Sequence, residues 1–162
     1  MPQNATVPEV GSDMPDLQLV GADDTRASLH SVRSGQRAVA YFLRASTCPA
    51  CVQHSRSIAQ LADSGQLADA KVLLIAPGGQ AQAQQLAERV PSEHMSIWAS
   101  GDAHSEAGLG TFLNIQHSGT FLVAADGTVA YRRTAKLPPN SFDRHELLAA
   151  IAHSATGRPP RR

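Results

Sequence analysis

Residues 38–51 read AVAYFLRASTCPAC, and this stretch decides the fold. Ala38–Leu43 is a continuous apolar run with β-branched and aromatic members, which is typical of a strand buried on both faces. The CPAC sequence at residues 48–51 then opens a predicted helix that ends at Ser64-Gly65. Pro49 suits the first helical turn, because its missing N–H would have had no partner there. The stretch therefore predicts a strand-to-helix junction that carries two cysteines.

On both sides of this junction the apolar pattern alternates between strand-like and helix-like segments. Strands are expected at Asp16–Val20, Lys71–Ala76, Met95–Trp98, Thr120–Ala124 and Val129–Tyr131, and helices at Ala27–Val32, Gln80–Val90, His104–Leu113 and Phe142–His153. The last two strands flank Asp126-Gly127, a strong hairpin signal. Alternating strands and helices imply crossovers around one sheet, and the hairpin adds antiparallel strands. We expect a single α/β domain with a central mixed sheet flanked by helices.

Length and composition exclude several classes of protein. The 162 residues suit one domain, and the 42% of hydrophobic residues suffice for a sizeable core. Basic and acidic residues balance at 14 each, and 4% of residues are aromatic. Neither a basic nucleic-acid surface nor a base-stacking platform is therefore expected. No apolar run approaches the ~20 residues that span a bilayer. The sequence predicts a protein that binds neither nucleic acid nor a membrane.

The two ends of the chain differ from its middle. Residues 1–12 are rich in proline and poor in large apolar groups, which predicts a flexible N-terminal arm. Residues 13–155 hold the predicted domain, and the basic, proline-containing residues 156–162 are expected to form a disordered tail. The N-terminus has neither the basic nor the apolar region of a secretory signal, and it begins with Met1, so a cytoplasmic location is expected.

The two cysteines, Cys48 and Cys51, are separated by two residues and favour chemistry over a structural role. A disulfide this short constrains almost no chain. At the start of a helix, free N–H groups and the helix dipole stabilise a thiolate, so Cys48 is the expected attacking sulfur. Cys51, one turn inside, is close enough to resolve what Cys48 forms. Two alternatives stay open: half of a metal site, although no second CxxC exists, and a pair of inert thiols.

The segment YFLRASTCPAC (41–51), followed by the hairpin GTFLVAADGTV (119–129), resembles the redoxin branch of the thioredoxin superfamily. In particular it is similar to peroxiredoxin-like proteins of the alkyl hydroperoxide reductase/thiol-specific antioxidant type. The opening GSDMPDLQLVGADD and the closing ELLAAI fit the same pattern, so the resemblance covers residues 11–152. Tyr41 stands where a typical peroxiredoxin has proline, seven residues before the peroxidatic cysteine.

This resemblance implies a thioredoxin-like fold with an N-terminal extension, in which residues 13–155 form a redoxin domain. It also implies an oxidoreductase that reduces peroxides or protein disulfides, with an external thiol reductant such as a thioredoxin and without a bound organic cofactor. Redoxins of this kind often pair through sheet edges or helix ends, so a homodimer is compatible with the family. Reduction of disulfides without peroxidase activity is the alternative within the same chemistry.

Four further residues are candidates for binding substrate or supporting the thiolate: Arg44, Thr47, Pro49 and Ser118. Arg44 offers positive charge near Cys48, or is simply a solvated arginine at the strand end. Thr47 is expected to cap the helix or to hydrogen-bond the sulfur, and capping is the commoner role for threonine at such a junction.

His117 carries a metal alternative. Copper-chaperone relatives of this superfamily pair two cysteines with a histidine shortly before the same hairpin, and two sulfurs with an imidazole suit copper(I). A surface histidine is the competing interpretation, and no metal ligand is assigned. His54 falls on the polar face of the predicted helix and is not expected to act as a base.

Overall fold

The computed structural model describes residues 8–90, 95–101, 111–112, 115–116, 118–135 and 141–154. The strands are β1 (Gln18–Gly21), β2 (Arg26–Ser28), β3 (Ala38–Phe42), β4 (Lys71–Ala76), β5 (Met95–Ala99), β6 (Thr111–Phe112), β7 (Ile115–Gln116), β8 (Ser118–Val123) and β9 (Val129–Ala135). The helices are α1 (Leu29–Arg33), α2 (Pro49–Asp63), α3 (Gln80–Arg89) and α4 (Arg144–Ser154).

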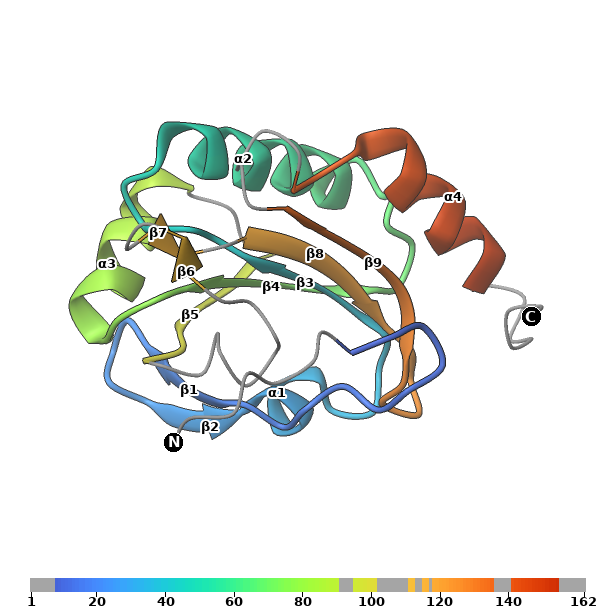
Figure 1. The fold of residues 1–162 in the computed structure, drawn as a ribbon, viewed down its shortest axis with the longest axis horizontal. Coiled ribbons are helices and arrows are strands. Elements are labelled where there is room, and N and C mark those ends of the chain that lie inside the picture. The colour runs from blue at the N-terminus through green and yellow to red at the C-terminus, as the bar shows by residue number, and fades with distance from the viewer. Residues whose placement is uncertain are drawn as a thin grey trace.

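A mixed seven-stranded sheet forms the centre of the molecule, in the order β2-β1-β5-β4-β3-β8-β9 (Figure 1). β3, β4 and β5 run parallel, as expected for strands joined by crossover helices, while β8 pairs with β3 and β9 in the antiparallel sense. β6 and β7 form a separate two-stranded sheet. The predicted α/β class with a mixed sheet is confirmed.

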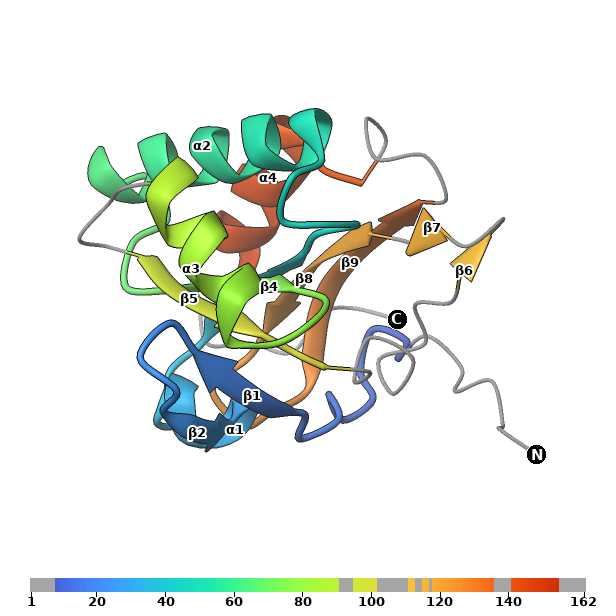
Figure 2. The same ribbon diagram turned by 90° about the vertical axis from the view of Figure 1, so that its left-hand side faces the viewer.

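The two faces of the sheet carry two separate apolar clusters, because successive side chains of a strand point to opposite faces. Val39 and Tyr41 of β3 join the cluster under α2, α3 and α4. Ala40 and Phe42 join the opposite cluster, which α1 and the segment before β1 cover. Figures 1 and 2 show α2 and α4 on one side of the sheet and α1 on the other. β3 is buried along its whole length, which explains its unbroken apolar sequence.

Arg33, at the end of α1, joins this helix to the β8–β9 turn. The side chain is 6% exposed. Its Nε donates to His30 Nδ1 at 2.7 Å, and its Nη1 donates to the carbonyl oxygens of Gln36, Ala124 and Ala125 at 3.1, 3.2 and 2.9 Å. Buried cations need such a full set of acceptors, so this arginine is part of the core.

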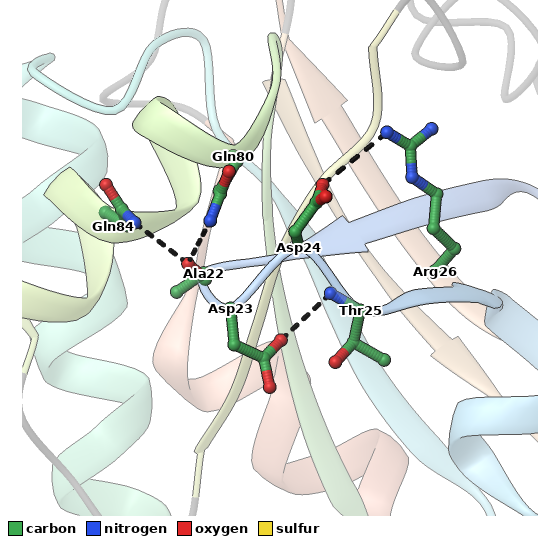
Figure 3. Close-up of polar contacts among 7 residues, drawn as sticks. All are labelled: Ala22, Asp23, Asp24, Thr25, Arg26, Gln80 and Gln84. Atoms are coloured by element: carbon green, nitrogen blue, oxygen red, sulfur yellow. Dashed lines mark hydrogen bonds and ion pairs between the residues drawn. The ribbon is translucent and has the colours of Figure 1, made fainter.

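A second polar contact holds the β1–β2 turn against α3 (Figure 3). The carbonyl oxygen of Ala22 accepts hydrogen bonds from Gln80 Nε2 and Gln84 Nε2, both at 3.0 Å. Within the turn, the Thr25 N–H donates to Asp23 Oδ1 at 3.0 Å. These contacts explain why glutamines occupy the exposed face of α3.

The strands β1 and β8 are shifted by one or two residues from their predicted bounds, and β9 extends to Ala135 rather than Tyr131. Three other predicted elements differ from the structure for reasons that the hydrogen bonds and strand pairing show. The predicted helical turn at Ala27–Val32 is strand up to Ser28 and helix only from Leu29, because the Ser28 hydroxyl accepts from the Ser31 N–H and caps the helix there. The last helix begins at Arg144 rather than Phe142, since Asp143 Oδ1 accepts from the Glu146 N–H at 2.9 Å.

The predicted helix at His104–Leu113 is the third difference. Thr111 and Phe112 form a strand paired with Ile115–Gln116, and two glycines before them had already weakened the helical pattern. Most of that segment, residues 104–110 and 113, lies outside the described residues.

The predicted N-terminal arm is attached to the sheet over its described part. The Gly11 N–H donates to the Val129 carbonyl at 2.8 Å, and the Val129 N–H donates to the Ser12 carbonyl at the same distance. Residues 8–12 therefore do not behave as the predicted free arm. Residues 1–7 and the predicted tail 156–162 lie outside the described residues. Across the described ranges, no helix has the length and apolar character needed to cross a membrane.

Candidate active site

The two cysteines lie where β3 leads into α2, as the sequence predicted. β3 ends at Phe42, and α2 begins at Pro49 with Cys48 as its N-cap in extended backbone conformation. The Cys51 N–H donates to the Cys48 Sγ at 3.4 Å, so a sulfur takes the place of the usual capping oxygen. Pro49 is exposed at the first helical position, where it needs no hydrogen-bond partner.

Both thiols are free, and both are buried to different degrees. Cys48 is 3% exposed and Cys51 is fully buried in the cluster under α2. The Cys51 Sγ accepts a hydrogen bond from the Arg44 N–H at 3.2 Å, and a second one from the Tyr41 side chain. Cys51 is therefore surrounded by Tyr41 of β3 and by Arg44, which follows β3, while Cys48 is the nearer of the two sulfurs to the surface.

The surroundings of Cys48 favour its thiolate. Burial raises the pKa of this thiol. Hydrogen bonds from the Cys51 thiol, the Cys51 N–H and the Arg44 side chain, together with the positive charge of Arg44, lower the pKa by more than burial raises it. The net pKa of Cys48 lies below its ordinary value of 9.0. Cys48 is therefore the more acidic sulfur of the pair.

Cys51 behaves in the opposite way. Burial raises its pKa, and so do donation of its thiol proton to Cys48 and the negative charge there, while the hydrogen bonds from the Arg44 N–H and Tyr41 oppose the rise. The outcome is a pKa of about 11. Cys48 is thus the sulfur that ionises first as the pH rises, while Cys51 keeps its proton at neutral pH.

The predicted supporting residues occupy different surroundings. Arg44 is half-buried, and its side chain lowers the pKa of Cys48 through hydrogen bonding and positive charge, which favours the predicted support of the thiolate over a solvated arginine. Its Nε is buried and has no hydrogen-bond partner among the described residues. Thr47 is exposed, and the predicted threonine cap is wrong because the adjacent cysteine caps α2 itself.

Ser118 lies at the start of β8, one residue before Gly119, which pairs with Phe42 at the end of β3. The side chain is fully buried, and within the described ranges its Oγ has no hydrogen-bond partner. Ser118 is thus close in the sheet to the strand end that leads to the dithiol. His117, the candidate for a metal site, lies outside the described residues. Among the residues that are described, no cluster of three or more metal-binding side chains occurs.

Sequence reasoning missed the residues that surround Cys51. Tyr41 was expected only as part of an apolar strand, yet its hydroxyl contacts Cys51 and lies 2.9 Å from the Ser141 Oγ. His54, predicted on the polar face of α2, is half-buried, with its ring 6.1 Å from Tyr41 and 5.3 Å from Phe142. The available signal was one hydroxyl-bearing side chain inside an otherwise apolar strand, because a buried phenol normally needs a polar partner.

The chain is similar to a known family in sequence and to several solved structures in fold. The family model described as Redoxin matches residues 9–151. Among curated proteins, no sequence matches the chain.

Several solved structures are similar in fold. A peroxiredoxin-like protein from Aquifex aeolicus has a TM-score of 0.79 at 12% identity, covering 93% of this chain and 90% of its own. A thiol peroxidase from Chromobacterium violaceum has a TM-score of 0.78 at 15% identity, with 98% and 94% covered. Peroxidoxin BcpB from Mycobacterium tuberculosis has a TM-score of 0.71 at 18% identity, with 90% and 97% covered. At these identities the likeness concerns the fold alone.

Proposed function

This chain belongs to the Redoxin family of thiol-dependent oxidoreductases, and we propose that Cys48 and Cys51 carry its reaction. In this proposal Cys48 is the attacking thiolate and Cys51 the resolving thiol. The substrate is a peroxide or a disulfide, and a separate dithiol protein such as a thioredoxin returns the two electrons. Arg44 supports the Cys48 thiolate, while Pro49, Thr47 and Ser118 border the site on which the oxidant acts.

With a peroxide, the reaction takes two steps at the dithiol. The Cys48 thiolate attacks one peroxide oxygen, the O–O bond breaks, and Cys48 becomes a sulfenic acid while an alkoxide or hydroxide leaves and takes up a proton. Cys51 then attacks the Cys48 sulfur, the S–O bond breaks, and water leaves as the disulfide forms. The external dithiol reduces that disulfide by thiol–disulfide exchange and closes the cycle.

One observation carries the proposal: the Cys48 sulfur caps α2 by accepting the Cys51 N–H at 3.4 Å, and this places the two sulfurs in surroundings that give them different acidities. The pKa of Cys48 is below its ordinary value, whereas burial raises the pKa of Cys51 to about 11. The nucleophile of such a cycle must be ionised before the oxidant arrives, and the resolving thiol must stay unreactive until then.

The burial of Cys48 favours a small oxidant. Its residue is 3% exposed, so a hydroperoxide reaches its sulfur with less movement of the protein than a disulfide of a folded protein requires. We therefore rank peroxide reduction ahead of protein-disulfide reduction for this site.

The test compares wild type, Cys48→Ser and Cys51→Ser in two assays, consumption of hydrogen peroxide with a dithiol reductant and reduction of insulin disulfides. We expect Cys48→Ser to abolish turnover. Cys51→Ser should react once with peroxide and stop at a sulfenic acid, which dimedone traps on Cys48. Full activity of Cys48→Ser would refute the assignment. Activity on insulin without activity on peroxide would reverse the ranking of the two substrates.

A further inference from the structure

A chain of buried hydroxyl groups lies behind Cys51. Tyr41 is fully buried in β3, and its Oη lies 2.9 Å from the Ser141 Oγ. The Ser141 carbonyl oxygen in turn accepts from the Thr120 Oγ1 at 2.7 Å. Tyr41 and Thr120 are direct partners across β3 and β8, and Ser141 and Thr120 are fully buried as well. Three polar side chains inside an apolar cluster are costly unless each has a partner, so their arrangement is specific.

This chain of hydroxyl groups ends on the Cys51 sulfur. Tyr41 packs in the same buried cluster as Cys51, with its ring 6.1 Å from that of His54 on the next turn of α2, and hydrogen bonding from its hydroxyl lowers the pKa of Cys51. Cys51 Sγ also accepts from the Arg44 N–H at 3.2 Å. Burial, followed by the nearby charge of Cys51, raises the pKa of the Tyr41 phenol well above its ordinary range. The phenol therefore keeps its proton and acts as a donor. Since it has a single proton, the Ser141 hydroxyl donates to Tyr41 Oη whenever Tyr41 donates to the sulfur.

The charge on Cys51 Sγ, and with it the need for hydrogen-bond donors, changes during the reaction. Before oxidation, the Cys51 thiol proton is shared with the Cys48 thiolate. Once Cys48 is a sulfenic acid or a mixed disulfide, Cys51 must lose that proton and attack. The negative charge then develops on Cys51 Sγ, which is fully buried. A buried anion needs preorganised donors. The Arg44 N–H already donates to this atom, and the Tyr41 hydroxyl favours its charged form.

We propose that Tyr41, oriented by Ser141, is a positioning residue that stabilises the Cys51 thiolate during formation of the disulfide. This inference rests on the proposed function, because it concerns the second half of that cycle. Cys51–S⁻ forms the S–S bond with Cys48, the S–O bond breaks, and the departing hydroxide takes the proton that Cys51 gave up, which yields water. Tyr41 keeps its own proton throughout and changes only the stability of the thiolate.

Tyr41→Phe tests this directly because it removes the hydroxyl and keeps the ring that packs against His54. Tyr131, the second tyrosine of the chain, lies in β9 and donates to Glu146 Oε1 at 2.8 Å, so Tyr131→Phe is a matched control. The first measurement titrates Cys51 by its ultraviolet thiolate absorbance in a Cys48→Ser background. Tyr41→Phe should move that titration to higher pH, and Tyr131→Phe should leave it unchanged.

The second measurement follows a single turnover with hydrogen peroxide. The rate of sulfenic acid formation on Cys48 should stay within about twofold of wild type in Tyr41→Phe. Disulfide formation should slow roughly 10-fold or more, the scale of losing one hydrogen bond to a charged group, and dimedone should trap correspondingly more sulfenic acid. Ser141→Ala should give a smaller effect in the same direction, which guards against a Tyr41→Phe variant that folds poorly.

An unchanged Cys51 titration together with an unchanged rate of disulfide formation would overturn the inference. The titration needs no peroxidase activity, so it remains decisive if the protein proves unable to reduce peroxides. An altered titration in an enzyme without peroxidase activity would refute the proposed function and leave the contact between Tyr41 and Cys51 supported.

Discussion

Alkylation of the reduced protein at pH 7 should modify Cys48 well before Cys51. With a pKa of about 11, Cys51 is ionised in about one molecule in 10⁴ at this pH. The pKa of Cys48 lies below 9.0, so at least about one molecule in 100 carries its thiolate. The thiolate populations therefore differ by at least about 100-fold in favour of Cys48.

Two further effects act on this ratio in opposite directions. A less acidic thiol gives a more nucleophilic thiolate, so each Cys51 thiolate is roughly 6–10-fold more reactive than a Cys48 thiolate. Burial lowers the reactivity of Cys51, because Cys51 is fully buried and Cys48 is the more exposed of the two. We expect Cys48 to react at least about 10-fold faster than Cys51.

The assay is timed iodoacetamide labelling, quenched and read by peptide mass spectrometry between pH 6 and pH 10. Labelling of Cys48 should rise with pH and level off at a lower pH than labelling of Cys51, because its thiolate population saturates above its pKa. Labelling of Cys51, measured in Cys48→Ser, should still be rising at pH 10. Equal rates for the two cysteines at pH 7, or faster labelling of Cys51, would refute the reasoning on which the choice of nucleophile rests.

Two other perturbations test the surroundings of the site. Arg44→Gln removes a hydrogen bond and a positive charge from Cys48, so the pKa of Cys48 should rise and its labelling at pH 7 should slow about 10-fold. The matched control is Arg56→Gln on the exposed side of α2, whose Nε donates to the Arg89 carbonyl, and an Arg44→Gln profile that coincides with this control would contradict the role of Arg44. Arg33→Met should lower the free energy of unfolding by about 2–4 kcal/mol in urea titrations, because four part-buried hydrogen bonds of the Arg33 side chain are lost. A loss below about 1 kcal/mol would show that Arg33 does not hold the β8–β9 turn.

Most of the fold could be predicted because it follows from short-range patterns. The apolar run before the cysteines predicted β3, and the Lys71–Ala76 run predicted β4 with the bounds that the structure has. Pro49 and Ser64-Gly65 predicted the two ends of α2. Errors occurred where a single hydrogen bond sets a boundary, as at Ser28 and Asp143, since many nearby residues could act as caps.

The cysteine pair of the candidate site could also be predicted from the sequence alone. Two cysteines one helical turn apart, placed directly after a buried strand, are local features, and helix geometry alone places the first sulfur at the N-terminus of α2. Which cysteine is the more acidic was predicted for the same reason. The helix cap was not, because both Thr47 and Cys48 carry suitable side chains and only the backbone conformation at the junction distinguishes them.

What lies around Cys51 required the tertiary structure. Tyr41 meets Ser141 across 100 residues of sequence, and Arg33 reaches the Ala124 and Ala125 carbonyls across more than 90. Composition and periodicity describe neighbours along the chain, whereas these partners become neighbours only when β3, β8 and the segment before α4 pack together. Local patterns in the sequence were enough to predict the dithiol and the strand-to-helix junction that lowers the pKa of its first sulfur. Packing decided which buried groups solvate the second sulfur, because that depends on distances between segments that no local pattern encodes.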